Sequence, residues 1–439
     1  MRLGLSAVPA VHADRPARPR IDVLDALRGL ALLGILQVNI QSFTWGAGEP
    51  LGYLAAPGSP DAHRTADQVV YFLQAAFLEG KFYPIFAFVF GVGLQLQMRS
   101  LRQTLQTLAQ AAPSRTAAGA RALYRRRLGV LFGMGILHSL LLYCGDVLAA
   151  YALCAAGLLC LEPVRTRALR RWALASMTLA ACALFVPVLV VLALGIDESG
   201  SPVPEAVVAA HATYTGSGFL AQLTQRGTDA AWQQLGSIPL FWPQVVALMT
   251  LGMLAARQGW LLHPERHRLL WRRALQAGLG LGLPCALAGA ALALLRMRDA
   301  PGAQGQWDAV LLGFGSLLSA AYVAGLLQAR RHAPGRALAA WLGWAGRASL
   351  SNYLLQSLLM ALLLGGWGLG WGAQATRLQL AGLGLLIFVA QVLASRAWLQ
   401  RFDQGPLEAL WRRWTYRGLT HPALPPAGQE GYPGPDARA

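Results

Sequence analysis

The feature that most constrains this sequence is a series of apolar runs of roughly 20 residues, the length that a helix needs to cross a lipid bilayer. Hydrophobic residues make up 55% of the 439 positions and charged residues only 13%, whereas a soluble domain has about 25% charged residues. This composition excludes a soluble globular domain, a disordered chain and a coiled coil. We therefore expect an all-α polytopic membrane protein, a bundle of about ten transmembrane helices. The runs cover residues 23–44, 82–98, 122–143, 146–161, 172–195, 238–256, 269–295, 307–329, 349–370 and 378–398.

Arginine clusters alternate with the apolar runs and predict how the chain crosses the membrane. The loops after the second, fourth, sixth, eighth and tenth runs are rich in arginine, as cytoplasmic loops are. The loops between them hold few arginines and carry acidic residues instead. This alternation predicts that both termini are cytoplasmic. The arginines of these cytoplasmic loops account for the formal net charge of +17. We therefore expect the protein to associate with the lipid bilayer and not with nucleic acid.

Between the runs, the sequence predicts three further helices and a division into five regions. Residues 62–80 are expected to form a separate interfacial helix, and residues 405–417 an amphipathic helix on the inner surface. A long outer loop, with a short helix over 205–225, is either a functional lid or a tolerated insertion. The expected regions are a cytoplasmic tail (1–20), an N-terminal transmembrane half (21–200), an extracytoplasmic loop (201–237), a C-terminal transmembrane half (238–417) and a disordered tail (418–439).

Polar residues within apolar runs are costly and point to function or to specific packing. Asp25 and Arg28 are three residues apart, so they share one helix face near the inner surface. Arg127, Arg347 and Asn352 lie at the same depth on other runs. This inner layer either binds an anionic ligand or consists of ion pairs, helix caps and arginines that anchor the helices at the membrane surface.

A second polar layer is expected nearer the outer surface. Asn39 is eleven residues beyond Arg28 and His138 is eleven residues beyond Arg127, so each lies about 16 Å further out along its helix. Asp146 follows His138 across a short turn, where a carboxylate beside an imidazole would make a general base. The alternative is that Asp146 caps a helix and His138 is a packed polar residue.

Two further charges flank a glycine at the outer end of the second run. Glu79 and Lys81 precede a run of aromatic residues, which is typical of an interfacial charge pair with an aromatic belt but also suits an acceptor site. The sequence contains no P-loop, no HExxH motif and no His and acid spacing for a metal cluster. We therefore expect no metal.

Several of these residues carry a resemblance to a known family. The chain resembles the YeiB-like bacterial membrane proteins, whose C-terminal half is called domain of unknown function 418, and the resemblance covers roughly residues 20–417. It implies a location in the bacterial inner (plasma) membrane. The matching stretches are Ile21 to Gly29 with Val38-Asn39-Ile40, Glu79 to Phe82, Leu137-His138, Gly145 to Leu148 with Tyr151, Gly346 to Tyr353 with Gln356, and Gly405 to Glu408.

This family is grouped with transmembrane acyltransferases, such as lysosomal heparan-glucosaminide acetyltransferases and bacterial glycan O-acyltransferases. The grouping implies a cytoplasmic acyl-CoA as co-substrate, no permanently bound cofactor, and an acceptor hydroxyl or amine on an envelope glycan outside. Asn39 matches an active-site Asn near the end of the first helix of the glucosaminide enzymes. Their catalytic His follows in the outer loop, but residues 45–60 of this sequence contain no His. Either His138 has taken that role or the chemistry differs.

The expected mechanism of acyl transfer gives each residue a role. His138 would deprotonate the acceptor, Asp146 would orient His138, and Asn39 would stabilise the oxyanion. The acceptor would be held by Glu79, Lys81 and Tyr151, and the donor by Asp25, Arg28, Arg127, Arg347 and Asn352. Two other functions remain open from the sequence: a transporter in which the two polar layers are gates, and a non-catalytic membrane protein of envelope assembly.

Overall fold

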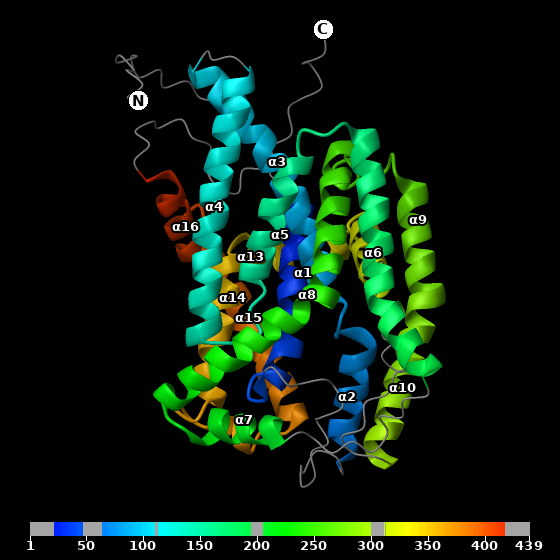
Figure 1. Ribbon diagram of the computed structural model, residues 1–439, viewed down its shortest axis with the longest axis vertical. Coiled ribbons are helices and arrows are strands. Elements are labelled where there is room, and N and C mark those ends of the chain that lie inside the picture. Colours follow the sequence, from blue (N-terminus) through cyan, green and yellow to red (C-terminus); the bar gives the residue numbers. More distant parts are fainter. Residues whose placement is uncertain are drawn as a thin grey trace.

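The computed structural model describes residues 22–46, 64–109, 113–194, 205–299, 311 and 313–417, and these residues contain helices and no strand. Most of the helices run along the long axis of the molecule (Figure 1). The all-α prediction is confirmed for this part of the chain, and the predicted tails at 1–20 and 418–439 lie outside it. The helices are α1 (Asp22–Ser42), α2 (Thr65–Phe77), α3 (Phe82–Ala109), α4 (Pro113–Leu141), α5 (Leu148–Leu158), η4 (Leu159–Leu161), α6 (Thr166–Ala193), α7 (Glu205–Gly216), α8 (Phe219–Gln258), α9 (Arg268–Ala277), η5 (Gly278–Gly282), α10 (Leu283–Asp299), α12 (Leu318–Ala329), α13 (Ala333–Arg347), α14 (Ser349–Leu364), η6 (Trp371–Ala373), α15 (Arg377–Leu399) and α16 (Pro406–Tyr416).

Several of these helices are suited to cross a membrane, which makes this a helical membrane protein. Among the described residues, four segments are long and apolar enough to span a bilayer: Asp22–Ser42, Thr65–Gln106, Arg268–Leu295 and Arg377–Leu399. The bent pair Phe219–Pro239 and Phe241–Gln258 would make a fifth. Three further apolar helices are shorter, with 10–17 residues: Leu148–Leu161, Gly313–Ala329 and Ser349–Leu364. Within the described residues, the ten predicted runs are therefore not matched by ten helices that pass as full spans.

The segment between the eighth and ninth apolar runs differs from the prediction. The sequence suggests a cytoplasmic loop with several arginines, but residues 333–347 form the helix α13. This helix packs against α1, α15 and α12. Its buried residues include Ala339, Leu342 and Ala345, which recur at helical spacing. Because only one face of α13 is apolar, its average hydropathy is too low to predict a membrane span, although that face is part of the core.

Glycines allow the central helices to approach one another closely. A Cβ atom on Gly29 of α1 would lie 2.0 Å from the backbone oxygen of Leu342, and one on Gly346 would lie 1.8 Å from the backbone oxygen of Asp25. Small residues at such crossings are typical of helix packing in membranes. The close contact of α1 with α13 brings Asp25 and Arg28 to the same place as Arg347.

The predicted outer loop at 201–237 is helical over its described residues. Glu205–Gly216 forms α7, and α8 begins already at Phe219 and continues to Gln258. The predicted helix over 205–225 is therefore broken at residues 217 and 218. The predicted boundary of the sixth run, at 238, falls inside α8, next to Pro239 and Pro243, where this helix bends by 63°.

Two of the other predicted helices are present. The predicted helix over 62–80 corresponds to α2, which packs against α10 and α15 and is joined to α3 through a turn at Gly80. Gly80 has a φ of 72°, a conformation that favours glycine. The predicted amphipathic helix over 405–417 corresponds to α16, which packs against α4 and α14 (Figure 1).

Candidate functional site

Four of the five predicted donor-binding residues converge on one cavity. This inner cavity lies among α1, α3, α4, α13, α14 and α16 and has an empty volume of about 1250 Å³. Asp25, Arg28, Arg127 and Arg347 all line it, although they come from three different helices.

Interactions within the protein hold the arginines of the inner cavity in place. Nη1 of Arg28 donates to Oδ1 of Asp25 at 3.1 Å. The guanidinium carbon of Arg127 lies 3.6 Å from the centroid of the Trp411 ring, and that tryptophan donates its indole N–H to the backbone oxygen of Arg127. Planar, positioned guanidinium groups of this kind suit phosphate and carboxylate ligands, which they can bind through two oxygens at once.

Glu408 of α16 faces the same cavity and caps α14. Its carboxylate accepts hydrogen bonds from the backbone N–H of Leu350 at 2.7 Å, from the backbone N–H of Ser351 and from the Ser351 hydroxyl. Burial raises the pKa of Glu408 above its usual value, although these hydrogen bonds oppose the shift. No side chain from the N-cap position of α14 bonds there, and the capping carboxylate comes from a different helix.

His138 and Asp146 form a pair that is wholly shielded from solvent. Nδ1 of His138 lies 2.8 Å from Oδ1 of Asp146, and both side chains are 0% exposed. The other carboxylate oxygen accepts the backbone N–H of Ala149 at 2.9 Å, in the first turn of α5. With Nδ1 donating to the carboxylate, Nε2 is the basic nitrogen of the ring. Nε2 is buried and has no hydrogen-bond partner among the described residues.

Tyr353 connects this pair to the inner cavity. Its ring centroid lies 5.0 Å from that of His138, and Tyr353 itself lines the cavity together with Val147 and Leu148, which directly follow Asp146. Tyr353 belongs to one of the stretches that resemble the family, but its sequence context predicts no role for it. Its position shows that one layer of side chains separates the imidazole from the space lined by arginines.

Asn39 is half-buried on α1, and within the described part of the chain it makes no polar contact with His138 or Asp146. One turn further along α1, the Ser42 hydroxyl lies 3.2 Å from the hydroxyl of Tyr143, which belongs to the turn between His138 and Asp146. The end of α1 therefore reaches the turn that carries the pair, whereas Asn39 itself does not.

The predicted acceptor residues do not form a common site. Lys81 is 0% exposed and donates through Nζ to the backbone oxygen of Ala75 at 2.7 Å, so it joins the turn at Gly80 to α2. The Tyr151 hydroxyl donates to the backbone oxygen of Tyr83 at 3.0 Å. Neither these two residues nor Glu79 lines the inner cavity. Their described contacts are those of residues that hold helices together.

Asn352 is likewise occupied by contacts within the protein. Its amide nitrogen donates to the backbone oxygen of Ala345 at 3.0 Å and to the Ser395 hydroxyl at 2.9 Å, and its backbone oxygen accepts the Gln391 amide at 3.0 Å. These bonds join α14 to α13 and α15. Asn352 is absent from the lining of the inner cavity.

Helix α8 contacts the hairpin that carries His138, and α7 contacts the segment after α1. The Gln234 amide donates to the backbone oxygen of Asp146 at 3.0 Å, and Nε of the fully buried Arg226 donates to the backbone oxygen of Leu140 at 3.0 Å. His211 lies 3.1 Å from the backbone oxygen of Thr44. The sequence reading of this region as an outer lid gave no indication of these bonds, because they depend on side chains far apart in the sequence.

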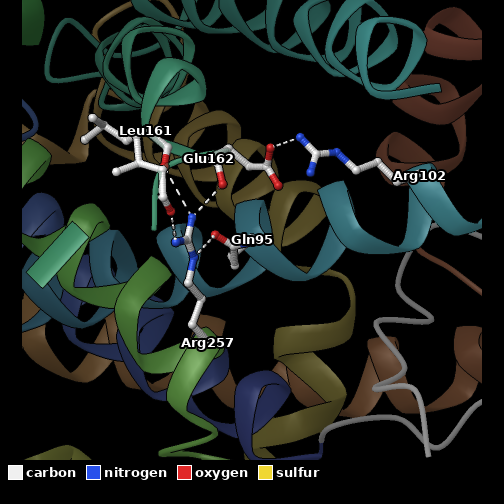
Figure 2. Close-up of polar contacts among 6 residues, drawn as sticks. Gln95, Arg102, Leu161, Glu162 and Arg257 are labelled. Carbon is white, nitrogen blue, oxygen red and sulfur yellow. Dashed lines mark hydrogen bonds and ion pairs between the residues drawn. The ribbon is translucent and has the colours of Figure 1, made fainter. Parts of the chain in front are cut away.

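A second polar cluster, which the sequence analysis does not single out, ties α8 to the turn after α5 (Figure 2). Arg257 donates to the Gln95 side chain at 3.0 Å and to the backbone oxygens of Leu161, Glu162 and Val164. The Glu162 carboxylate in turn pairs with Arg102. Each of the three guanidinium nitrogens of Arg257 donates to the protein, so this cluster acts as a clamp between helices.

Comparison with known proteins identifies relatives along most of the chain. "Uncharacterized protein YxaH" of Bacillus subtilis (strain 168) is 27% identical over 420 residues, covering 90% of this chain and 94% of the relative. "Uncharacterized protein YeiB" of Escherichia coli (strain K12) is 28% identical over 404 residues, covering 90% and 96%. Residues 255–418 match the family described as "Protein of unknown function (DUF418)". Along most of its length the chain is therefore similar to YxaH and YeiB, and its C-terminal part matches the DUF418 family. No solved structure matches it.

The DUF418 segment builds one wall of the inner cavity. From this segment come Arg347, Tyr353, Glu408 and Trp411, whereas Asp25, Arg28 and Arg127 come from the part of the chain before residue 255. The His138–Asp146 pair also lies before it. The cavity and its connection to the pair therefore require both the DUF418 segment and the part of the chain before it.

Proposed function

We propose that the protein is a transmembrane acyltransferase that moves an acyl group from a cytoplasmic acyl-CoA to a hydroxyl or amine of a glycan or envelope component on the outer side. One observation carries this proposal: a buried His–Asp pair lies one side-chain layer away from a cavity lined by three arginines. General-base catalysis needs the first feature, and binding of a phosphorylated donor needs the second.

The donor would bind with its phosphates at Arg28, Arg127 and Arg347 in the inner cavity. Its acyl thioester would then extend past Tyr353 towards His138. Asp25 would hold Arg28 in place through the ion pair between them. In this arrangement the phosphates bind to the arginines near the inner surface, and the thioester lies in the shielded interior. There, hydrolysis of the thioester by water is suppressed.

His138 would accept the proton of the acceptor hydroxyl or amine at Nε2. Asp146 would fix the ring so that Nε2 is the free nitrogen, and would stabilise the imidazolium that forms. Asn39 is proposed, from the family resemblance alone, as the oxyanion-stabilising residue. For that role, the turn between α4 and α5 would have to move nearer to α1 when substrates bind.

The topology is part of the proposal. We propose a multi-pass protein of the bacterial inner membrane with ten membrane passages and both termini in the cytoplasm. The alternation of arginine-rich and acidic loops supports it. The shorter helices α5, α12 and α14 would cross only together with their flanking turns. Reporter fusions after residues 110, 165 and 417 should all read as cytoplasmic, and a fusion at residue 200 as external; the reverse pattern contradicts the topology.

Calorimetric binding of acetyl-CoA to the purified, detergent-solubilised protein tests the donor site. We expect Arg127→Ala to weaken binding by about tenfold or more, because a hydrogen bond to a charged group contributes about 1.5–3 kcal/mol. Arg126→Ala is the matched control, because Arg126 is the neighbouring residue, is exposed and does not line the cavity. Equal binding by both variants, or no binding by the folded wild type, contradicts the donor site.

Transport is the second candidate, and the 63° bend of α8 within the membrane region favours it, because broken helices are common at transporter sites. The two functions differ in what they consume. Thioester cleavage that is lost in His138→Ala supports acyl transfer. Uptake of a solute into vesicles without thioester cleavage supports the transporter instead.

A further inference from the structure

His138 also lines a second cavity, which is almost entirely apolar. This groove runs between α4, α14, α15 and α16 and has an empty volume of about 1480 Å³. Besides His138, its polar lining residues are Ser351, Asn352 and Ser395. Ser351 is bonded to Glu408, and Asn352 is bonded to Ser395. His138 therefore differs from the other three: its Nε2 has no partner among the described residues.

The side chains along the groove are exposed apolar groups. Leu137 is 56% exposed, Leu355 is 41% exposed and Trp414 is 44% exposed. On α14 the lining extends from Ala348 to Leu358, ten residues or about 15 Å of helix. That is half of the roughly 30 Å hydrocarbon core of a bilayer. A groove of this length and composition on a membrane protein matches one hydrocarbon chain in one leaflet.

The buried His138–Tyr353 contact separates the two cavities. Tyr353 lines the inner cavity and His138 lines the groove, and their ring centroids are 5.0 Å apart. The arginines lie in the inner cavity, so a phosphorylated donor belongs there. The groove contains no charged side chain in its lining, so it suits the apolar part of the other substrate.

We propose that the groove holds the hydrocarbon chain of a membrane lipid and that the acyl acceptor is a hydroxyl on this lipid or on its head group. The inference rests on the proposed acyltransferase function and narrows its acceptor to a lipid-linked molecule. The acceptor hydroxyl gives its proton to Nε2 of His138, and its oxygen attacks the thioester carbonyl carbon. The new C–O bond forms, the C–S bond breaks, and the thiolate of coenzyme A takes the proton from the imidazolium.

Transfer of label from radiolabelled acetyl-CoA tests this inference. The purified protein is placed in permeable vesicles made from the total lipid extract of a bacterium that carries it. Label is then measured in the organic extract, in the aqueous phase as water-soluble acetyl products, and as free coenzyme A released. We expect label in the lipid fraction with the wild type and none with His138→Ala.

Two groove variants and one control make the test specific. Leu355→Trp and Leu358→Trp fill the groove and should lower lipid labelling by about tenfold or more, because misplacing the acceptor by about 1 Å can cost 100-fold. Both should bind acetyl-CoA as the wild type does, since neither residue lines the inner cavity. Leu386→Trp is the control: it faces outward from α15 at 66% exposure and lies outside the groove.

The outcomes separate this inference from the proposed function. Coenzyme A release with label only in water-soluble products overturns the lipid acceptor but not acyl transfer. Unchanged lipid labelling in both groove variants, shown to be folded by their elution and thermal unfolding, overturns the groove as the binding site. Absence of both acetyl-CoA binding and coenzyme A release overturns the acyltransferase and this inference together.

Discussion

Asp146 holds the His138 ring with one carboxylate oxygen and closes the first turn of α5 with the other. The distances are 2.8 Å to Nδ1 of His138 and 2.9 Å to the backbone nitrogen of Ala149. One side chain thus sets both the orientation of the imidazole and the start of the helix that follows it. The two alternatives that the sequence offers for Asp146, a helix cap and a partner of His138, are satisfied at once.

The double role of Asp146 predicts separate effects on catalysis and on stability. Asp146→Asn keeps an oxygen for one of the two contacts but loses the charge, so His138 is no longer held in one tautomer. We expect kcat for acyl transfer to fall by about 100-fold or more, with little change in KM for acyl-CoA, because Asp146 does not line the inner cavity. Steady-state kinetics at varied acetyl-CoA measure both constants.

Asp146→Ala removes the cap as well as the charge. It should lose the same activity and, in addition, about 1 kcal/mol of stability relative to Asp146→Asn, measured by thermal unfolding in detergent. A wild-type kcat in Asp146→Asn would show that the pair is structural only.

Sequence periodicity and apolar length predict most helices of this protein, because each membrane-facing helix must be apolar over many residues. Asp22–Ser42 and Arg377–Leu399 agree with the predicted runs to within a few residues. The α4–α5 turn was also predictable, since His138 and Asp146 are near in sequence and a hairpin brings them together.

The helices α13 and α8 show where such reasoning is insufficient. In α13 the arginines outweigh the buried face in a hydropathy average, although that face packs on α1. In α8 the prolines at 239 and 243 resemble a loop-to-helix boundary, whereas the helix continues through them with a bend. Both outcomes depend on packing against distant helices, which hydropathy does not record.

The same distinction applies to the site residues. The inner arginines share one depth, and depth is readable from sequence because helices have a fixed rise per residue. The sequence does not show in the same way which neighbouring helix or cavity a side chain faces. Lys81 and Asn352, placed at the expected depths, turn out to bond within the protein, and Tyr353 and Glu408 line the cavity without having been assigned to it.

The glycine contacts between α1 and α13 predict which small substitutions are damaging. Gly346→Ala would place a methyl group 1.8 Å from the backbone oxygen of Asp25, and because this atom is backbone, the helices must move apart. We expect a loss of about 1–3 kcal/mol in stability. Gly129→Ala on α4 is the control, since a Cβ there meets nothing within 4 Å. Thermal unfolding of the two variants, which differ from wild type by one methyl group each, should clearly separate them; equal midpoints would contradict the close packing.

Glu408 predicts a pH dependence of stability. Burial raises its pKa above 4.5 in the folded state, so the folded state binds the proton more tightly than the unfolded state does. Its contribution to stability is therefore fully present below pH 4.5 and is lost as the pH rises through the folded-state pKa. Glu408→Gln, which cannot ionise, should reduce the decline in melting temperature over this window. A wild-type slope in this variant would mean that other groups cause the decline, and the exposed Asp403→Asn serves as the control.

The Arg257 clamp predicts that charge alone cannot replace a guanidinium. Arg257 donates to Gln95 and to three backbone oxygens at the end of α5 (Figure 2). Lysine keeps the positive charge but has three N–H donors on one nitrogen, so Arg257→Lys leaves at least one of the four acceptors without a donor. We expect a loss of at least about 1 kcal/mol, the usual contribution of one hydrogen bond. Arg266→Lys, in the turn before α9, has no such bonds among the described contacts and should unfold as the wild type does.

The clamp should have no effect on the donor site, because Arg257 does not line the inner cavity. The folded Arg257→Lys protein should therefore bind acetyl-CoA with wild-type affinity. Weaker binding at a temperature where the variant is fully folded would mean that the clamp acts on the donor site.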